Sequence, residues 1–276
     1  MIDTHSHIDG KEFAEDLEDV IQRAKDAGVQ KIFVPGICRK DTPHLLDVCH
    51  AFPNYLYPMI GLHPENIMDE DYHHALDELE KILQETLASQ TDSPSASHSP
   101  IIAIGEVGLD LYWDTSYKQE QIDVFEQQIL WAEKYHLPLM IHCRNAHAEL
   151  MELMEKHRSS NLCGVFHCFT GTEEEARDLL TFPNFMLGIG GVLTFKNSTL
   201  REVVKNAIPL SRIVLETDSP YMAPAPNRGK RNESAYVKFV AERLAEIFET
   251  SFHEIVYQTT KNTAKVFKKV TFFNEI

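Results

Sequence analysis

Short apolar runs alternate with longer segments of helical period along the whole chain. Between the runs, segments such as EFAEDLEDVIQRAKDAG place apolar residues at i, i+3, i+4 and i+7 spacing and end at a glycine. YKQEQIDVFEQQILWAEKYH and AHAELMELMEKH repeat the helical spacing of apolar residues. The alternation predicts βαβ units and a parallel sheet. The eight runs are MIDTHSH, KIFVPGI, LYPMIGLHP, IIAIGEVGLD, PLMIHC, GVFHCF, FMLGIGGVLT and RIVLETDSPY.

Eight such units in 276 residues match an α/β fold of the TIM (β/α)8 barrel type in number and length. An open doubly wound sheet is the alternative, but the chain has no glycine-rich phosphate loop after its first run. One stretch departs from the alternation, SQTDSPSASHSP at residues 89–100, which is rich in serine and proline. We expect it to be a flexible surface insertion on the face away from the catalytic one. The sequence therefore predicts a single barrel domain over residues 1–276.

Polar side chains gather where the predicted strands end, which is where TIM barrels carry their active sites. Within a strand, residues two apart share a face, so the histidines of DTHSH point the same way. A lone histidine in such a place is more often a core residue, but burying this many polar groups costs several kcal/mol unless they are paired or bind metal. The residues are His5, His7, His63, Glu106, Asp110, His142, Arg144, His167, Glu216 and Asp218.

Six of these residues are candidate metal ligands: His5, His7, Glu106, His142, His167 and Asp218. A single catalytic zinc takes three protein ligands and a water, so six indicate two divalent ions that share a carboxylate. We expect Glu106 to bridge, with His5, His7 and Asp218 on one ion and His142 and His167 on the other. Imidazole-rich ligation favours Zn, Mn, Fe or Ni over Mg, and the sequence leaves the metal open.

The net charge of −16 disfavours broad binding to nucleic-acid backbone. A phosphate substrate remains compatible with it, because bound divalent ions invert the local field. The sequence contains no apolar run long enough for a membrane span and no secretory signal pattern, and its five cysteines lack zinc-type spacing. We therefore expect a cytoplasmic protein with reduced thiols, no membrane partner and no obligate protein partner.

Six stretches together resemble the signature stretches of the TatD-type metal-dependent DNases, in the same order from the start of the chain to about Asn232: DTHSH, GLHP, GEVGLD, IHCR, FHCFTG and ETDSPYMAP. The resemblance implies a TIM barrel of the metal-dependent hydrolase superfamily and a two-metal site. It also implies phosphodiester hydrolysis, typically by a Mg-dependent exonuclease acting on DNA. The family's ligands would fall on the six residues already selected, with His63 and Arg144 close enough to touch phosphate.

A metal-activated water would then attack phosphorus, with Asp218 as the candidate proton acceptor and Glu106 supporting both ions. His63 and Arg144 would hold the phosphate oxygens, since the planar fork of arginine matches phosphate. Arg228 and Lys230 lie in the basic stretch NRGKR and are expected to bind the substrate, which we expect to be DNA with single-stranded ends. Tyr112, Trp113 and Phe169 are candidates for stacking on bases.

Three other functions stay open at this point. The first is an amidohydrolase acting on a small amide, lactone, ester or phosphoester. Many of these enzymes bridge their metals with a carboxylated lysine at the position of Glu106. The glutamate found here favours the nuclease type. The second is ester hydrolysis on aminoacyl-tRNA by the same residues. The third is a non-catalytic binding protein, which predicts missing ligands although all six are present.

Overall fold

The computed structural model describes residues 1–68, 71–92, 99–158 and 161–272. The chain forms two compact units. Unit 1 contains residues 1–34 and 167–276, and unit 2 contains residues 35–166. Each is described separately below.

Unit 1 holds four parallel strands in the order β7, β8, β1, β2. β7 pairs with β8 and β1 with β2. A parallel bridge between Ser6 and Ser219 joins the β8 and β1 segments, and the Thr4 amide donates to the Leu215 carbonyl at 3.0 Å. The strands are β1 (Ile2–Asp3), β2 (Lys31–Val34), β7 (Phe185–Ile189) and β8 (Ile213–Leu215).

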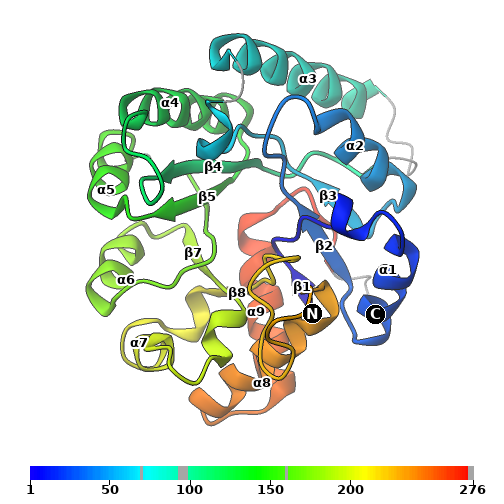
Figure 1. Cartoon of the computed structure of the whole chain (residues 1–276), viewed down its shortest axis with the longest axis vertical. Helices are drawn as coiled ribbons and strands as arrows, with labels where there is room; N and C mark the ends of the chain where they lie inside the picture. The colour runs from blue at the N-terminus through cyan, green and yellow to red at the C-terminus, as the bar shows by residue number, and fades with distance from the viewer. Residues whose placement is uncertain (69–70, 93–98, 159–160, 273–276) are drawn as a thin grey trace. The chain divides into compact units, whose positions relative to one another are not determined.

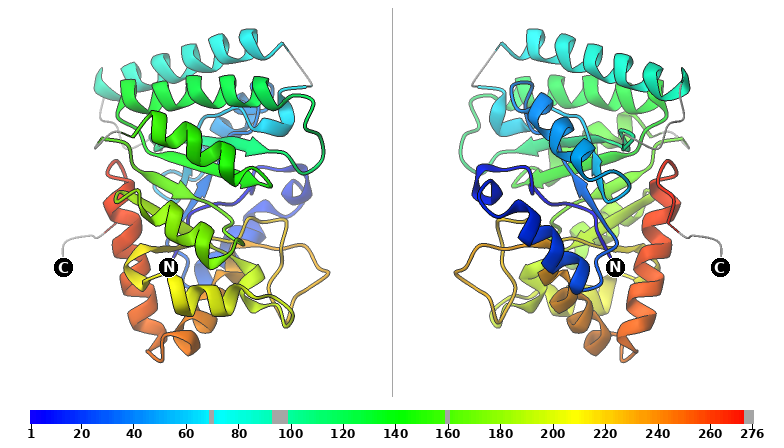
Figure 2. Two further views of the ribbon diagram at one scale, coloured as in Figure 1. Left: turned by 90° about the vertical axis from the view of Figure 1, so that its left-hand side faces the viewer. Right: turned by 90° about the vertical axis from the view of Figure 1, so that its right-hand side faces the viewer.

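The helices of unit 1 bury their apolar faces, and α6, α8 and α9 pack on its strands. In α1, Val20, Ile21 and Ala24 are buried, as the helical period predicts, although the helix begins later than its pattern and follows a short 3₁₀ turn. The last two helices pack side by side (Figure 2). The helices are α1 (Leu17–Asp26), α6 (Glu173–Leu180), α7 (Leu200–Ala207), α8 (Val237–Ile247) and α9 (Phe252–Val266).

Unit 2 also holds four parallel strands, in the order β3, β4, β5, β6. β5 pairs with β4 on one side and with β6 on the other. A parallel bridge between Ile60 and Ile104 and a hydrogen bond from the Ile102 amide to the Pro58 carbonyl, at 3.1 Å, join the β3 and β4 segments. The strands are β3 (Leu56–Pro58), β4 (Ile104–Asp110), β5 (Leu139–Arg144) and β6 (Gly164–Phe166).

In unit 2, α4 and α5 flank β4 and β5 (Figure 1), and α3 lies beside α4 (Figure 2). The buried face of α4 includes two glutamines one heptad apart, Gln121 and Gln128. The Gln121 amide bonds both backbone groups of Asp110, and the Gln128 amide bonds both backbone groups of Leu62. These pairs fix the end of β4 and the segment before His63. The helices are α2 (Thr42–Ala51), α3 (Tyr72–Asp92), α4 (Lys118–Tyr135) and α5 (His147–Lys156).

Each of the eight apolar runs coincides with a strand of the described part of the chain, and β5 alone extends past its run, by the single residue Arg144. The predicted insertion at residues 89–100 begins inside α3, which reaches Asp92, and its residues 93–98 lie outside the described part of the chain. No helix among the described residues is long and apolar enough to cross a membrane. The single-domain organisation over residues 1–276 and the cytoplasmic location stay predictions.

Candidate active site

Unit 1 brings two imidazoles and a carboxylate to one point beyond β1 and β8. His5 Nε2 lies 3.3 Å from His7 Nε2. Asp218 Oδ1 lies 3.8 Å from the first nitrogen and 3.6 Å from the second. His5 is fully buried, while the side chains of His7 and Asp218 are 16% and 14% exposed, so the cluster opens toward solvent on one side.

The spacing of these three atoms fits a metal ion. A point equidistant from all three, in their plane, lies about 2.1 Å from each, which matches ordinary zinc–nitrogen and zinc–oxygen distances. Burial favours the neutral acid of Asp218, but the imidazoles of His7, His5 and His167 outweigh it and hold the pKa below its usual value. The carboxylate is therefore ionised at neutral pH, as a ligand must be.

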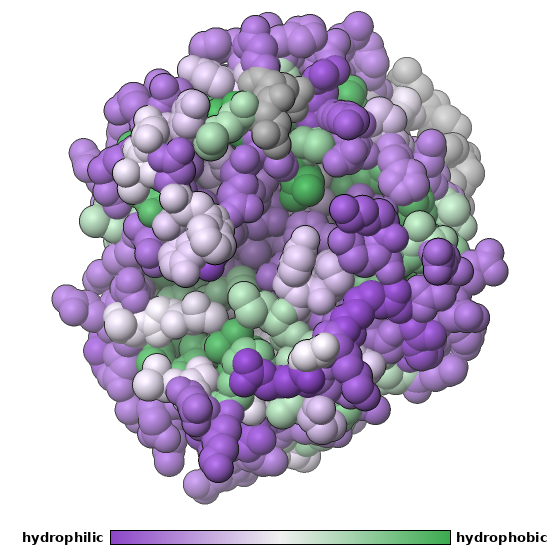
Figure 3. All heavy atoms as spheres, viewed as in Figure 1, coloured by the Kyte–Doolittle hydropathy of each residue, from purple (hydrophilic) through white to green (hydrophobic). Residues whose placement is uncertain are grey.

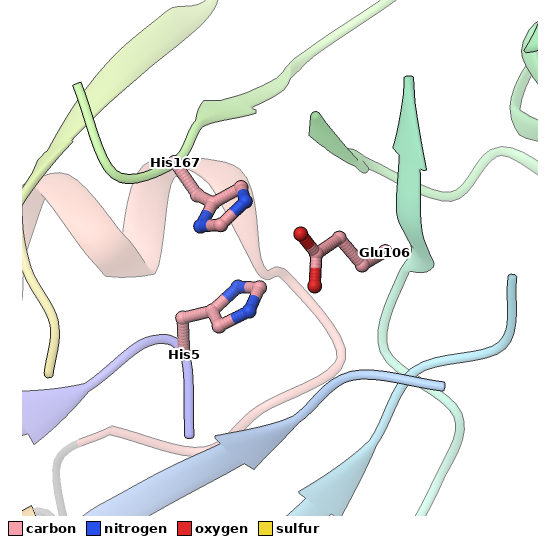
Figure 4. A group of neighbouring side chains, drawn as sticks. All are labelled: His5, Glu106 and His167. Atoms are coloured by element: carbon pink, nitrogen blue, oxygen red, sulfur yellow. The ribbon is translucent and has the colours of Figure 1, made fainter. Parts of the chain in front are cut away.

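His167 lies against His5 in the same unit. The two rings stack with centroids 4.0 Å apart and an interplanar angle of 5° (Figure 4). Behind His167, the fully buried Glu216 accepts the Cys168 amide and places Oε1 4.0 Å from His167 Nδ1. Cys168 and Asp218 both adopt left-handed backbone conformations, with φ of 48° and 55°. Such conformations in non-glycine residues are uncommon and gather at functional sites.

Asp3 stabilises the backbone around the unit 1 cluster through hydrogen bonds. Its carboxylate is fully buried and accepts the Thr217 amide at 2.9 Å, the Thr217 hydroxyl at 2.7 Å and the His5 amide at 3.4 Å. These bonds tie the segment of His5 to the residue just before Asp218. Burial raises the pKa of Asp3 to about 7, and the hydrogen bonds oppose this only in part.

Unit 2 carries a second cluster, centred on Glu106 of β4. Glu106 Oε1 lies 3.2 Å from His63 Nε2 and 3.0 Å from His142 Nδ1 (Glu106 is drawn in Figure 4). His63 Nδ1 accepts the Glu65 amide at 3.1 Å, and burial lowers the pKa of His63. A neutral imidazole that accepts at Nδ1 carries its proton on Nε2, so His63 donates to Glu106.

Asp110 completes this second cluster. Its Oδ2 lies 2.9 Å from His142 Nε2, and its Oδ1 accepts the Tyr112 amide at 3.0 Å. Burial by itself would lower the pKa of His142, but the carboxylates of Asp110 and Glu106 outweigh it and raise the pKa to about 9. A divalent cation would compete for the position of that proton, since metals bind the neutral imidazole. Glu106 and His142 are thus chemically suited to hold a divalent ion, while His63, whose two ring nitrogens are both engaged, supports Glu106.

Arg144 ends β5 two residues after His142. Its guanidinium carbon lies 3.7 Å from the centroid of the Tyr112 ring and 5.4 Å from that of Trp113. Both aromatic rings are largely exposed, whereas Phe169 is buried in unit 1 and is not available for stacking on a base.

In the basic stretch after β8, Arg231 forms ion pairs with another part of the chain, whereas Arg228 and Lys230 form none with the residues that the structure describes. Arg231 binds Asp16 through two nitrogens, at 2.8 and 2.7 Å, and lies over the Phe13 ring, so it anchors its loop to the start of α1. Arg228 lies 4.0 Å from the Phe195 ring centroid. Within the described part of the chain, Lys230 forms no ion pair.

The TatD-related DNase family model matches residues 2–268. The chain belongs to this family. It is 37% identical over 268 residues to the uncharacterized metal-dependent hydrolase YabD of Bacillus subtilis, a match that covers 97% of this chain and 99% of YabD. It is 29% identical over 273 residues to the 3'-5' ssDNA/RNA exonuclease TatD of Erwinia amylovora, covering 97% and 99% of the two chains.

The TatD-family relative YjjV from Escherichia coli K12 has a crystal structure that superposes with a TM-score of 0.86 at 30% identity, covering 97% of this chain and 98% of YjjV. TIM-barrel-like amidohydrolases are among the structural neighbours of the chain, which confirms the predicted α/β fold class. The chain is a metal-dependent hydrolase of the TatD family with buried clusters of His, Glu and Asp.

Each of the six residues predicted as ligands takes part in a cluster of the TatD-family chain. His5, His7, His167 and Asp218 meet in unit 1, and Glu106 and His142 meet in unit 2. The ligand selection missed two carboxylates, Asp110 and Glu216, that contact these histidines. A signal was present in the sequence: Asp110 is four residues from Glu106 and Glu216 two from Asp218, so each shares a strand face with a selected residue.

Proposed function

We propose that this protein is a divalent-metal-dependent exonuclease that hydrolyses phosphodiester bonds at single-stranded DNA ends. The family membership supports hydrolysis, and the relative described as a 3'-5' ssDNA/RNA exonuclease supports the substrate class. The observation that carries the proposal is the pairing of imidazoles with carboxylates in or beyond the strands of both units, His5–His7–Asp218 and His63–Glu106–His142.

Two divalent ions, Mg, Mn or Zn, are the cofactors of this proposal. The six residues His5, His7, Glu106, His142, His167 and Asp218 would hold them, with Glu106 contributing to both. A bound ion of this kind polarises a phosphoryl oxygen and lowers the pKa of a coordinated water.

The remaining steps belong to the chain's own groups. Asp218 accepts the proton of the attacking water, because the surrounding histidines keep it ionised. His63 donates its Nε2 proton to Glu106 and so fixes the orientation of that carboxylate. Arg144 directs its planar fork toward the phosphate, and Arg228 and Lys230 bind the strand farther from the reacting bond.

Substitution of Glu106 by alanine tests this proposal. We expect hydrolysis of end-labelled single-stranded DNA to fall more than about a hundredfold, because loss even of an outer-shell partner costs 10–100-fold in such sites. The assay uses EDTA-treated protein with Mg, Mn or Zn added back, and reads stepwise shortening on a gel. Metal content, measured by mass spectrometry after dialysis, falls in the same variant.

His253→Ala is the matched control, because His253 is an exposed histidine on α9 outside both clusters. It should retain activity and metal. DNA left intact by the wild-type protein under every metal, together with hydrolysis of a small ester or lactone, would replace the exonuclease by a small-molecule hydrolase.

A further inference from the structure

Two large aromatic side chains are exposed next to the unit 2 cluster. Trp113 is 72% exposed and Tyr112 is 48% exposed. Their rings meet edge to face, with centroids 4.6 Å apart and an interplanar angle of 86°. The face of the molecule drawn in Figure 3 is largely hydrophilic. A tryptophan that is left mostly in water on such a protein indicates a binding role, since aromatic rings gain most by being covered.

The loop that carries this pair is held in place by hydrogen bonds that its backbone amides donate. The Leu111 amide donates to the Arg144 carbonyl at 2.9 Å, and the Tyr112 amide donates to Asp110 Oδ1 at 3.0 Å. Farther along, the Ser116 amide donates to Asp114 Oδ1 at 2.7 Å. A ligand that stacks here therefore does not need to order the loop, which favours affinity.

A short chain of contacts connects the aromatic pair to the candidate ligands. Asp110 bonds the Tyr112 amide with one oxygen and His142 Nε2 with the other. His142 in turn contacts Glu106 at 3.0 Å. Two hydrogen bonds through Asp110 thus link the backbone of this pair to His142, a group that the proposed reaction needs, all inside unit 2.

The chemistry of the pair and of Arg144 selects a nucleobase as the ligand. Aromatic rings stack on the π-face of any base, and this attraction does not depend on net charge. That matters here because a chain of net charge −16 gains little from the phosphate backbone. Arg144, whose guanidinium lies over the Tyr112 ring, supplies a cation beside the stacked base for the adjoining phosphate.

We propose that Tyr112 and Trp113 form a stacking site for a nucleobase of the substrate strand, with Arg144 completing it. This inference rests on the proposed nuclease function and assigns to unit 2 the binding of a nucleobase of the strand. The site is tolerant of base identity, because stacking reads the ring face and not its hydrogen-bonding edge.

Tryptophan fluorescence tests binding without turnover. The chain has two tryptophans, Trp113 and the buried Trp131, so an added base that stacks on the surface affects mainly the former. Titration of EDTA-treated protein with a short deoxythymidine oligomer should quench the emission. Trp113→Phe, which retains only Trp131, should show no quenching at the same oligomer concentrations. Equal quenching in both proteins would overturn the proposal.

A kinetic test compares this oligomer with a second one of the same length. In the second oligomer the last three residues at each end are abasic. Wild-type protein should hydrolyse the base-bearing oligomer with a KM about tenfold lower, as stacking of one base predicts. Trp113→Ala should lose this preference. Tyr257→Ala, which removes an exposed aromatic ring from α9 with the same 48% exposure as Tyr112, should keep it.

The outcomes separate the two proposals. Hydrolysis of neither oligomer by wild-type protein, with quenching intact, would reject the nuclease function and leave the binding site standing. Hydrolysis with an unchanged preference in Trp113→Ala would reject the stacking site alone. A change in sedimentation mass of Trp113→Ala with unaltered oligomer binding would make the surface a protein interface and also reject it.

Discussion

Glu216 illustrates how one buried carboxylate determines the shape of a candidate site. It accepts the Cys168 amide and faces His167, while β7 passes close behind it. A Cβ atom at Gly188 would meet Glu216 Oε2 at 2.0 Å, whereas one at Gly190 would find only ordinary contacts from 3.6 Å outward. Glycine at position 188 is therefore required by the space that Glu216 occupies.

Gly188→Ala should destabilise the protein by about 1–3 kcal/mol, because the added methyl group forces a packed, buried carboxylate to move. Thermal unfolding should show a fall of about 2–4 °C in Tm for each kcal/mol lost. Gly190→Ala, two residues along the same segment, should change Tm much less. If Gly188→Ala costs as much in a Glu216→Ala background as in the wild type, the clash with Glu216 is not the cause.

At the scale of elements, an ion-pair network holds the loop after β8 against α1. Asp16 precedes α1 and binds both Arg23 and Arg231, while Arg23 also binds the buried Glu233 at 2.7 Å. Because Arg231 is ion-paired with Asp16, it is not free to contact a substrate strand. Lys230 and Arg228 are the residues of that loop left for the predicted contact with substrate.

Asp16→Asn should reveal this network through the pH dependence of stability. The hydrogen bond from Arg231 lowers the pKa of Asp16 to about 2, against about 3.9 for a free aspartate. The stabilisation is thus fully present above about pH 4 and is lost as the pH falls toward 2. At pH 7 the variant should unfold at a lower urea concentration than the wild type, with a free energy of unfolding about 1 kcal/mol smaller. This difference in free energy should narrow below pH 4.

Lys230→Gln provides the contrast for this experiment. It should leave the urea midpoint unaltered and weaken binding of single-stranded DNA, with a smaller dependence of affinity on salt. A pH-independent gap for Asp16→Asn would show that its carboxylate does not act through the ion pairs.

At the scale of the whole molecule, the question is whether residues 1–276 unfold as one domain. The two units each carry four parallel strands and their own apolar core. Both tryptophans, Trp113 and Trp131, belong to unit 2. Tryptophan fluorescence therefore reports on unit 2, while far-ultraviolet circular dichroism reports on the helices of both.

A single domain predicts coincident urea transitions by the two methods, because two-state unfolding gives the same midpoint for every probe. We expect agreement within experimental error, both with EDTA and with added divalent metal. Metal should move both transitions upward together, since an ion that binds only the native state stabilises it. A fluorescence transition at a distinct urea concentration would contradict the single-domain prediction.

The sequence by itself determined the alternation of strands and helices and placed the candidate polar residues in the strands or shortly after them. Alternation of apolar runs with helical period is a local property, so it is legible without any contact being known. The spacing of two in DTHSH likewise fixed that His5 and His7 share a face, and the structure brings their Nε2 atoms to 3.3 Å. Family membership followed from six short stretches in a fixed order.

Only the tertiary structure decided which of these side chains meet. Asp110 contacts His142, His63 donates to Glu106 and Asp16 holds Arg231 over sequence separations of 32, 43 and 215 residues. Such pairings depend on strand register and on clamps such as Gln121 and Gln128, whose polar side chains a hydrophobic pattern does not select. Exposure is equally non-local: Phe169 and Trp113 look alike in the sequence, yet packing buries the first and leaves the second in water.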